Sequence, residues 1–399
     1  MQGQSRNYYV LLIRGVVATF LSRLAMDFNN LYIIALGASP FQLSTVQALG
    51  SAADALVSVP AGWLSDTYSL KKIMIFGMLI QALSVAFYAF ARSWEWIIVA
   101  MILASLTMAL VFRVQMILVV NSLPSGSRAT GLGMRTTIIE AFSILAPTMG
   151  GVLIYYFGGI SVEGIRPLYY IQLIGIAVIG IYVSLQLEDK RTSIATHTRS
   201  FLGQYNDMLR TGVGMKRFVL LQTLGSITWG MLMPFPMVYV AEFKGADSLT
   251  IGYMGTCMVL VSMFLAVPMG SLADRKGRKL TVFVTRPFMY GCYLLLILAP
   301  EGAPLLLLIA WSMRGVMMAS NAWTTITIEM APPEYRGRWI GFTAFFQNLM
   351  RVPAMILGGY LYESVDPTLV FIIPIVVDAL LRMPILATIP ETLKNKATE

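Results

Sequence analysis

The sequence predicts an all-α membrane protein with twelve transmembrane helices in two six-helix, pseudo-symmetric bundles. Three observations predict this fold: an apolar composition, regularly spaced apolar runs and an internal repeat. Of 399 residues, 57% are hydrophobic and 12% are charged, whereas about 25% of the residues in a soluble domain are charged. A soluble fold could not bury so much apolar surface, but a bilayer accommodates it, since each span needs about 20 apolar residues.

Charged and turn-forming residues divide the chain into apolar runs long enough to cross a membrane. Helices satisfy their own backbone hydrogen bonds in lipid, so each run is expected to be helical. The expected spans are residues 8–36, 43–65, 72–91, 95–122, 131–157, 166–187, 217–241, 249–272, 279–299, 303–330, 337–362 and 367–390.

The basic residues indicate how these spans are oriented. Of the 29 Lys and Arg residues, 18 fall on one side of the predicted membrane, three on the other and eight within spans. The positive-inside rule therefore places both termini and the central connection in the cytoplasm of a multi-pass plasma membrane protein. The net charge of +9 thus reports topology, and no nucleic-acid partner is expected.

A single register shift of 208 residues superposes landmarks of the first half on the second. It pairs Asp66 with Asp274, and Arg128 with Arg336, among others. Parallel repeats of this kind form two bundles related by an axis along the membrane normal. We expect bundles at 1–188 and 217–399, joined by a cytoplasmic linker at 189–216 that contains an amphipathic helix.

Two loop motifs carry a resemblance to a known family. Residues 62–71 read Gly-Trp-Leu-Ser-Asp-Thr-Tyr-Ser-Leu-Lys, and residues 270–279 read Gly-Ser-Leu-Ala-Asp-Arg-Lys-Gly-Arg-Lys. Both resemble the G-x-L-x-D-R-x-G-R-K signature of the major facilitator superfamily, and the chain looks most similar to its twelve-helix drug/proton antiporter branch. The resemblance implies a monomeric secondary transporter that moves a small solute by alternating access, with no cofactor and no catalytic or metal site.

The same resemblance assigns a cytoplasmic gate to the loops after the second, fourth, eighth and tenth spans. An acid at one helix end can accept hydrogen bonds from the free N–H groups that begin a neighbouring helix. The alternative is that these residues are solvated loop charges that fix topology. The expected gate residues are Gly62, Asp66, Lys71, Arg128, Gly270, Asp274, Arg275, Gly277, Arg278 and Arg336.

Charged residues within the spans are the functional shortlist, because a charge at the bilayer centre costs at least about 2.5–3.5 kcal/mol. Some are expected to pair along one helix, as Asp378 does with Arg382 four residues later. In the family, the first, fourth, seventh and tenth spans mainly line the substrate cavity. Its expected lining is Asn30, Tyr32, Arg113, Trp229, Arg314, Asn321, Trp323, Asn348 and Arg351.

Proton coupling is expected to use a carboxylate within the spans, because the single histidine, His197, lies in the central connection. Asp27 in the first span ranks first, followed by Glu140 and Asp54. A carboxylate in a partly dehydrated cavity can couple proton release to the arrival of a cation or substrate. The alternative for Asp27 is a salt bridge to Arg23 that fixes helix packing.

The fifth span holds Ala146-Pro147-Thr-Met-Gly150-Gly151, which is similar to the G-P-x-x-G-G element of the family's drug and proton antiporters. Small residues let helices approach closely. This element favours proton-coupled efflux of amphipathic, cationic or drug-like compounds.

Arginines outnumber acids within the spans by eight to five, which favours an alternative function, proton-coupled symport or exchange of an organic anion. A receptor stays open, because sequence cannot show flux. A membrane enzyme is disfavoured, since the sequence has no phosphate loop and no metal or nucleophile motif.

Overall fold

The structure is a computed structural model that describes residues 6–67, 69–124, 128–188, 215–330 and 336–393. Each of the twelve predicted spans coincides with one helix or with consecutive helices separated by a short break, and the described residues contain no strand. Ten of these helical segments are long and apolar enough to cross a membrane by length and composition. The predicted all-α membrane fold is therefore confirmed. Of the predicted linker at 189–216, residues 189–214 lie outside the described part of the chain, and residues 215 and 216 begin α11.

The helices group into two compact units, the first formed by residues up to 195 together with residues 246–256. The second contains residues 196–245 and 257–399, so the first turns of α13 group with the first unit. The bundle boundaries inferred from the sequence remain a prediction.

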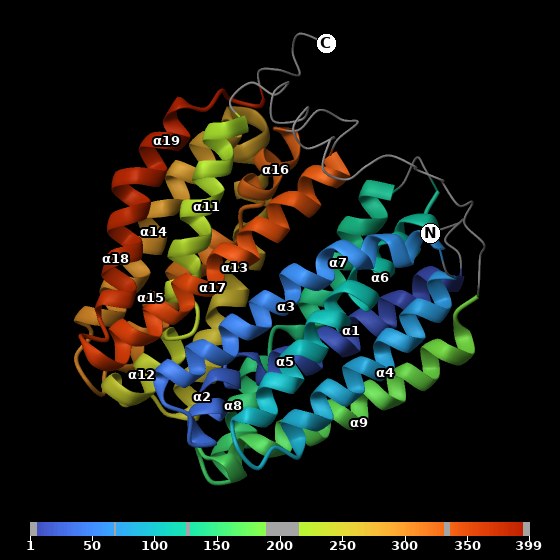
Figure 1. The fold of residues 1–399 in the computed structure, drawn as a ribbon, viewed down its shortest axis with the longest axis horizontal. Helices are drawn as coiled ribbons and strands as arrows, with labels where there is room; N and C mark the ends of the chain where they lie inside the picture. The colour runs from blue at the N-terminus through green and yellow to red at the C-terminus, as the bar shows by residue number, and fades with distance from the viewer. Residues whose placement is uncertain (1–5, 68, 125–127, 189–214, 331–335, 394–399) are drawn as a thin grey trace. The chain divides into compact units, whose positions relative to one another are not determined.

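The first unit contains long helices that run side by side, and α1, α4 and α9 are neighbours (Figure 1). Its buried core includes Leu11, Met74, Val111 and Val183 from four different spans. The helices are α1 (Arg6–Met26), α2 (Asn29–Ala35), α3 (Pro40–Thr67), α4 (Leu70–Ala89), α5 (Glu95–Thr107), the π-helical turn η1 (Met108–Phe112), α6 (Arg113–Asn121), α7 (Arg128–Ser143), α8 (Ala146–Tyr156) and α9 (Val162–Gln186).

In the second unit, α11 packs along α17, and α14 packs along α15 (Figure 1). Phe218, Trp339 and Leu386 are fully buried in its core. The helices are α11 (Met215–Leu232), α12 (Pro236–Lys244), α13 (Ser248–Lys276), α14 (Arg278–Leu298), α15 (Pro304–Met318), α16 (Ala322–Glu329), α17 (Arg336–Ser364), α18 (Leu369–Val377), the π-helical turn η4 (Asp378–Arg382) and α19 (Met383–Thr388).

Several spans are broken within the predicted membrane region. The first span breaks at Asp27 and Phe28, which form a turn between α1 and α2. The tenth breaks at residues 319–321, between α15 and α16. Broken helices leave backbone polar groups without their usual partners, so they are tolerated where they are buried in protein or line a cavity. The breaks therefore direct attention to what lies beside them.

Candidate functional site: an arginine-rich cavity

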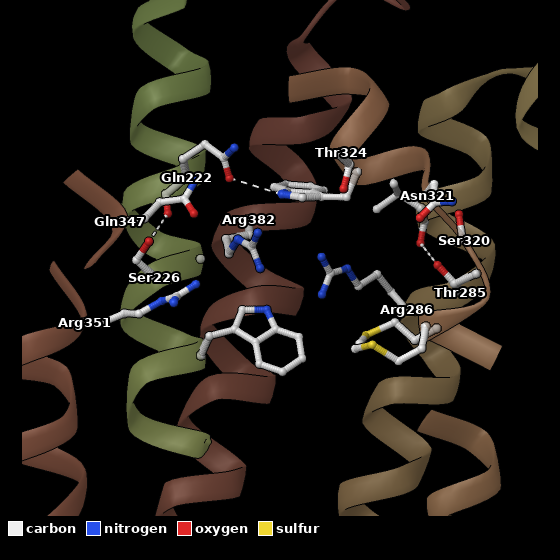
Figure 2. Close-up of a pocket in the computed structure, with 16 residues that line it drawn as sticks. Gln222, Ser226, Thr285, Arg286, Ser320, Asn321, Thr324, Gln347, Arg351 and Arg382 are labelled. Atoms are coloured by element: carbon white, nitrogen blue, oxygen red, sulfur yellow. Dashed lines mark hydrogen bonds between the residues drawn. The ribbon is translucent and has the colours of Figure 1, made fainter. Parts of the chain in front are cut away.

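A cavity of about 350 Å³ opens within the second unit. This volume lies in the range of about 300–1,000 Å³ typical of small-molecule sites. Its walls come from five spans, and three arginine side chains point into it (Figure 2). The lining residues are Gln222, Gly225, Ser226, Trp229, Val282, Thr285, Arg286, Met317, Met318, Ser320, Asn321, Trp323, Thr324, Gln347, Arg351 and Arg382.

The charged residues that line this cavity are all basic. Arg286 comes from α14, Arg351 from α17 and Arg382 from η4, and none of the described lining residues is acidic. Amide and hydroxyl side chains such as Gln222, Ser226 and Thr285 add polar groups. Because guanidinium groups donate hydrogen bonds and accept none, the cavity is built to receive acceptors and negative charge.

Asp378 is not among the residues that line the cavity, but its carboxylate contacts two of the lining arginines. Its Oδ1 accepts a hydrogen bond from the Nη1 of Arg382 and lies 3.7 Å from the Nη1 of Arg286. Its Oδ2 accepts from the Tyr290 hydroxyl at 2.6 Å. Asp378 is 0% exposed, Arg382 2% and Arg286 7%. Two buried cations therefore share one buried carboxylate.

Trp323 provides an aromatic surface beneath both guanidinium groups. The Cζ of Arg382 lies 4.8 Å from the centre of a Trp323 ring, and that of Arg286 lies 5.4 Å from it. The indole is held in turn, because its Nε1 donates to the Oε1 of Gln222 at 3.2 Å. Cation–π contacts of this kind fix an arginine without neutralising it.

The position of Arg382 depends on two local features. Gly225 on α11 leaves room for it, since a Cβ added there would lie 2.5 Å from the Nη2 of Arg382. Asp378 and Arg382 also begin and end a π-helical turn, closed by a hydrogen bond from the Met383 N–H to the Asp378 carbonyl. Single π-helical turns inside α-helices frequently occur at functional sites.

Four of the predicted cavity residues line this space, namely Trp229, Asn321, Trp323 and Arg351. Asn348 does not line it but accepts a hydrogen bond from the Nη1 of Arg351 at 3.2 Å. The structure therefore brings together the predicted residues of the second half with the exception of Arg314.

The other predicted cavity residues lie elsewhere. Arg314 stacks over Trp311, with its Cζ 4.5 Å from the ring centre. Tyr32 is 0% exposed, and its hydroxyl donates to the Tyr88 carbonyl at 3.0 Å. Asn30 accepts a hydrogen bond from Gln47 at 2.7 Å, and Arg113 is exposed. None of these four contributes to the cavity described above.

The predicted proton-coupling residues lie in the first unit. Asp27 is half-buried at the break between α1 and α2, and its Oδ2 would lie 2.3 Å from a Cβ added at Gly255. Glu140 accepts a hydrogen bond from the Nη2 of Arg23 at 2.7 Å. Asp54 is half-buried on α3. The structure thus pairs Arg23 of α1 with Glu140 of α7, 117 positions further along the chain.

The predicted fifth-span packing element lies at two close helix contacts within the first unit. A Cβ added at Gly150 would lie 2.1 Å from the Leu24 carbonyl oxygen of α1, and one at Gly151 would lie 2.3 Å from the Ser248 carbonyl oxygen of α13. Pro147 lies in the first turn of α8. Only glycine permits backbones to approach this closely.

In the second half, the predicted gate motif is a network of ion pairs and caps. Arg278 bonds to Asp274 at 2.7 Å and lies 3.5 Å from Glu329. The side chain of Asp274 is 73% exposed, and the acceptor at the start of α14 is Glu391. The Glu391 carboxylate accepts from the backbone N–H groups of Arg278 and Lys279 at 3.0 and 3.1 Å.

Gly277 makes that contact possible. Its φ of +120° is a conformation that favours glycine, and a Cβ there would lie 2.8 Å from the Oε2 of Glu391. Gly270, by contrast, has nothing within 4 Å of such a Cβ, and Arg275 is exposed.

The first-half motif is built differently. Ser69, which the 208-residue shift pairs with Gly277, caps α4 by accepting from the Lys72 N–H at 3.4 Å. Lys71 is half-buried and Arg128 is exposed. Gly62 and Asp66 fall in the last turns of α3 and Arg336 begins α17, and the surroundings of these three lie outside the described part of the chain.

Sequence reasoning missed the roles of Arg286, Arg382 and Glu391. Asp378 and Arg382 do pair four residues apart, as expected, but the pair also contacts Arg286 and borders the cavity. The sequence did contain a sign of this site, namely arginines in the ninth, eleventh and twelfth spans. A charge in contact with lipid is costly, so these side chains are expected to face a shared polar space.

Ten helical segments that are long and apolar enough to cross a membrane, together with a polar cavity inside one unit, are typical of a multi-pass membrane transporter. The family model of the Major Facilitator Superfamily matches residues 15–352 and 218–398. The chain belongs to this superfamily, as the signature motifs indicate.

Relatives and solved structures agree with this assignment. The chain is 25% identical over 297 residues to the multidrug resistance protein MdtL of Shewanella oneidensis, covering 74% of this chain and 73% of the relative. It is 20% identical over 309 residues to the multidrug resistance protein MdtH of Aeromonas hydrophila, covering 77% and 75%.

Among solved structures, the nucleoside transporter NupG superposes with a TM-score of 0.77 at 14% identity, covering 96% of this chain and 100% of that one. A D-xylose–proton symporter gives 0.69 at 13% identity, covering 97% of each chain. At these identities the likeness shows the fold alone.

Proposed function

We propose that this transporter moves an amphipathic organic anion across the plasma membrane by alternating access, coupled to protons. The observation that carries the proposal is the cavity lined by Arg286, Arg351 and Arg382, with no acid among its described lining residues. A cationic substrate would be repelled there, because unit charges a few ångströms apart interact by several kcal/mol at a partly buried site. An anion would receive hydrogen bonds from the same groups.

The rest of the lining supports a substrate with an apolar body. Trp229 and Trp323 offer aromatic surface, and Met317 and Met318 offer an adaptable apolar wall. A carboxylate or sulfonate attached to an aromatic ring would match both the basic residues and the apolar residues of this lining. The volume of about 350 Å³ favours a compact molecule over a peptide or a lipid.

The remaining parts of the proposal rest on the sequence. Asp27 is the first proton-coupling candidate, with Glu140 and Asp54 next. Both termini lie in the cytoplasm according to the positive-inside rule, and the protein acts as a monomer, as the family resemblance implies. The bundles 1–188 and 217–399 act as the two halves of the alternating-access cycle.

Uptake by proteoliposomes tests the substrate class. Purified full-length protein is reconstituted and given naphthalene-2-sulfonate under an imposed pH gradient, with (2-naphthylmethyl)trimethylammonium as a cation of matched shape. We expect the sulfonate to accumulate in the direction of the proton gradient. We expect the ammonium compound neither to accumulate nor to compete.

Arg351→Gln should lower sulfonate uptake roughly tenfold or more, since a hydrogen bond to a charged group contributes about 1.5–3 kcal/mol. Arg92→Gln, which removes an exposed arginine outside the cavity, is the matched control and should transport normally. Equal uptake of cation and anion, or full activity of Arg351→Gln, would contradict the anion assignment.

A second candidate is proton-coupled efflux of amphipathic drug-like compounds. The names of the relatives MdtL and MdtH favour it, as does the fifth-span element at Pro147, Gly150 and Gly151. The same vesicles separate the two candidates: extrusion of the ammonium compound against its gradient, driven by inward proton flow, supports efflux of cations and excludes the anion proposal.

A further inference from the structure

We propose that Asp378 is a built-in counter-anion that competes with the substrate for Arg286 and Arg382, so that the cavity binds an organic anion and a proton together. This inference rests on the proposed function, because it concerns how the same cavity receives its anion. It assigns a proton-binding role to a residue of the twelfth span, in addition to the role proposed for Asp27.

The geometry supports competition. Arg286 and Arg382 both line the cavity, whereas Asp378 is 0% exposed and contacts both from behind. A guanidinium group between a carboxylate on one side and an open cavity on the other can turn its donors toward either acceptor. An anion that enters the cavity therefore offers the arginines what Asp378 now supplies.

The charges explain why a proton must accompany the anion. With Asp378 ionised, one carboxylate contacts two buried guanidinium groups, and drawing them toward the substrate would leave that carboxylate with the Tyr290 hydroxyl as its remaining hydrogen-bond partner. A buried carboxylate that loses its cations costs several kcal/mol. Protonation removes this cost, because the neutral carboxyl group needs no cation.

Asp378 is the only carboxylate among the described groups that contact one another at this turn. Arg382 faces it from its own helix, and Arg286 and Tyr290 face it from α14. Three other elements pack against this turn, namely α11, α18 and α19. The sequences of α18 and α19 contain no titratable residue, and α11 has Lys216 and Arg217 only in its first turn. Arginine and tyrosine ordinarily titrate above about pH 10.

Proton counting during binding tests the proposal. Naphthalene-2-sulfonate is a suitable probe because it stays ionised, so any proton bound or released belongs to the protein. Titration calorimetry in buffers of different ionisation enthalpy should show uptake of about one proton per bound sulfonate. Since the protonated form binds the anion, the affinity should fall by roughly tenfold for each pH unit above the pH at which Asp378 ionises.

Asp378→Asn should bind the sulfonate with no proton uptake and with little change in affinity between about pH 6 and about pH 9. Tyr290→Phe removes only the hydroxyl that bonds to the carboxylate, so it tests the proposal if the first variant does not fold. Without that hydrogen bond, Asp378 accepts a proton more readily, and we expect sulfonate binding to persist to higher pH.

Three outcomes would overturn the inference. Proton uptake that persists in Asp378→Asn would assign the proton to another group. A pH profile of Tyr290→Phe that matches the unmodified protein would show that the site does not control binding. Sulfonate binding by the unmodified protein without proton uptake would remove this inference alone, whereas no sulfonate binding at any pH would remove the proposed anion substrate as well.

Discussion

At the scale of single residues, Glu391 shows how one side chain can organise a helix start. Its carboxylate accepts the first free N–H groups of α14, where the helix dipole favours negative charge. We expect Glu391→Gln to lower the free energy of unfolding by about 0.5–2 kcal/mol, the range measured for lost helix caps. A lower midpoint of thermal unfolding of the purified protein would report this loss.

The matched control for that measurement is Glu301→Gln, since Glu301 is exposed in the connection between α14 and α15. Its unfolding midpoint should not change. If both variants unfold at the same temperature as the unmodified protein, Glu391 does not stabilise α14.

The pairing of charged residues between helices could not be predicted from the sequence, as Arg23 shows. Arg23 has a potential partner four residues away at Asp27, and helical spacing favours that pair. The structure joins Arg23 to Glu140 on α7, 117 positions along the chain. The spacing of residues identifies the ion pairs that are possible within one helix. Which partner a charged side chain contacts also depends on which helices pack beside it. That information is absent from a single span.

At the scale of helices, hydropathy predicted every span but not the breaks within them. The turn at Asp27 and Phe28 and the π-helical turns at Met108–Phe112 and Asp378–Arg382 leave the apolar pattern almost unchanged. Hydropathy averages over a whole span and so cannot locate one extra residue in a turn. Those breaks are nevertheless where Asp27 and Asp378 lie.

Close glycine contacts recur in both units and can be tested as a packing device. A Cβ at Gly150 would lie 2.1 Å from the Leu24 carbonyl oxygen, and one at its repeat partner Gly358 would lie 2.8 Å from the Met231 carbonyl oxygen. We expect Gly150→Ala to destabilise the protein by about 1–3 kcal/mol, because backbone must move to relieve the overlap.

The thermal unfolding midpoint again provides the measurement, and Gly180→Ala is the matched control. A Cβ at Gly180 would meet only the Cε of Met78, at 3.7 Å, which is ordinary contact. An alanine there should leave stability unchanged or raise it slightly, since it restricts the unfolded chain. Equal midpoints for both variants would show that the Gly150 contact is not close in the folded protein.

At the scale of the whole molecule, the internal repeat predicted the architecture but not the asymmetry of the charges. The shift of 208 residues pairs Arg286 with Met78, Arg351 with Ser143 and Arg382 with Ile174. The repeat therefore preserves helices, glycine contacts and loop motifs, while the cavity arginines belong to the second half alone. Many transporters share this fold, so the fold constrains the helices, the glycine contacts and the loop motifs. The charges that line the cavity depend on the substrate.

The cavity arginines lie in the second half of the chain, whereas the proposed proton-coupling residue Asp27 lies in the first half. Asp27 lies at a helix break, its carboxylate against Gly255 and its neighbour Pro147, far in sequence from the cavity residues. If Asp27 carries a coupling proton, Asp27→Asn should abolish accumulation of naphthalene-2-sulfonate driven by a pH gradient, since a neutral amide cannot exchange a proton.

The same variant should still bind the sulfonate and should still exchange internal for external sulfonate when no pH gradient is applied, because the arginine cavity is intact. Measuring both activities in one vesicle preparation separates coupling from binding. Ser22→Ala, an exposed neighbour on α1, serves as the control and should accumulate the sulfonate normally. Gradient-driven accumulation by Asp27→Asn at the unmodified rate would exclude Asp27 as the coupling residue and leave that role to Glu140, Asp54 or Asp378.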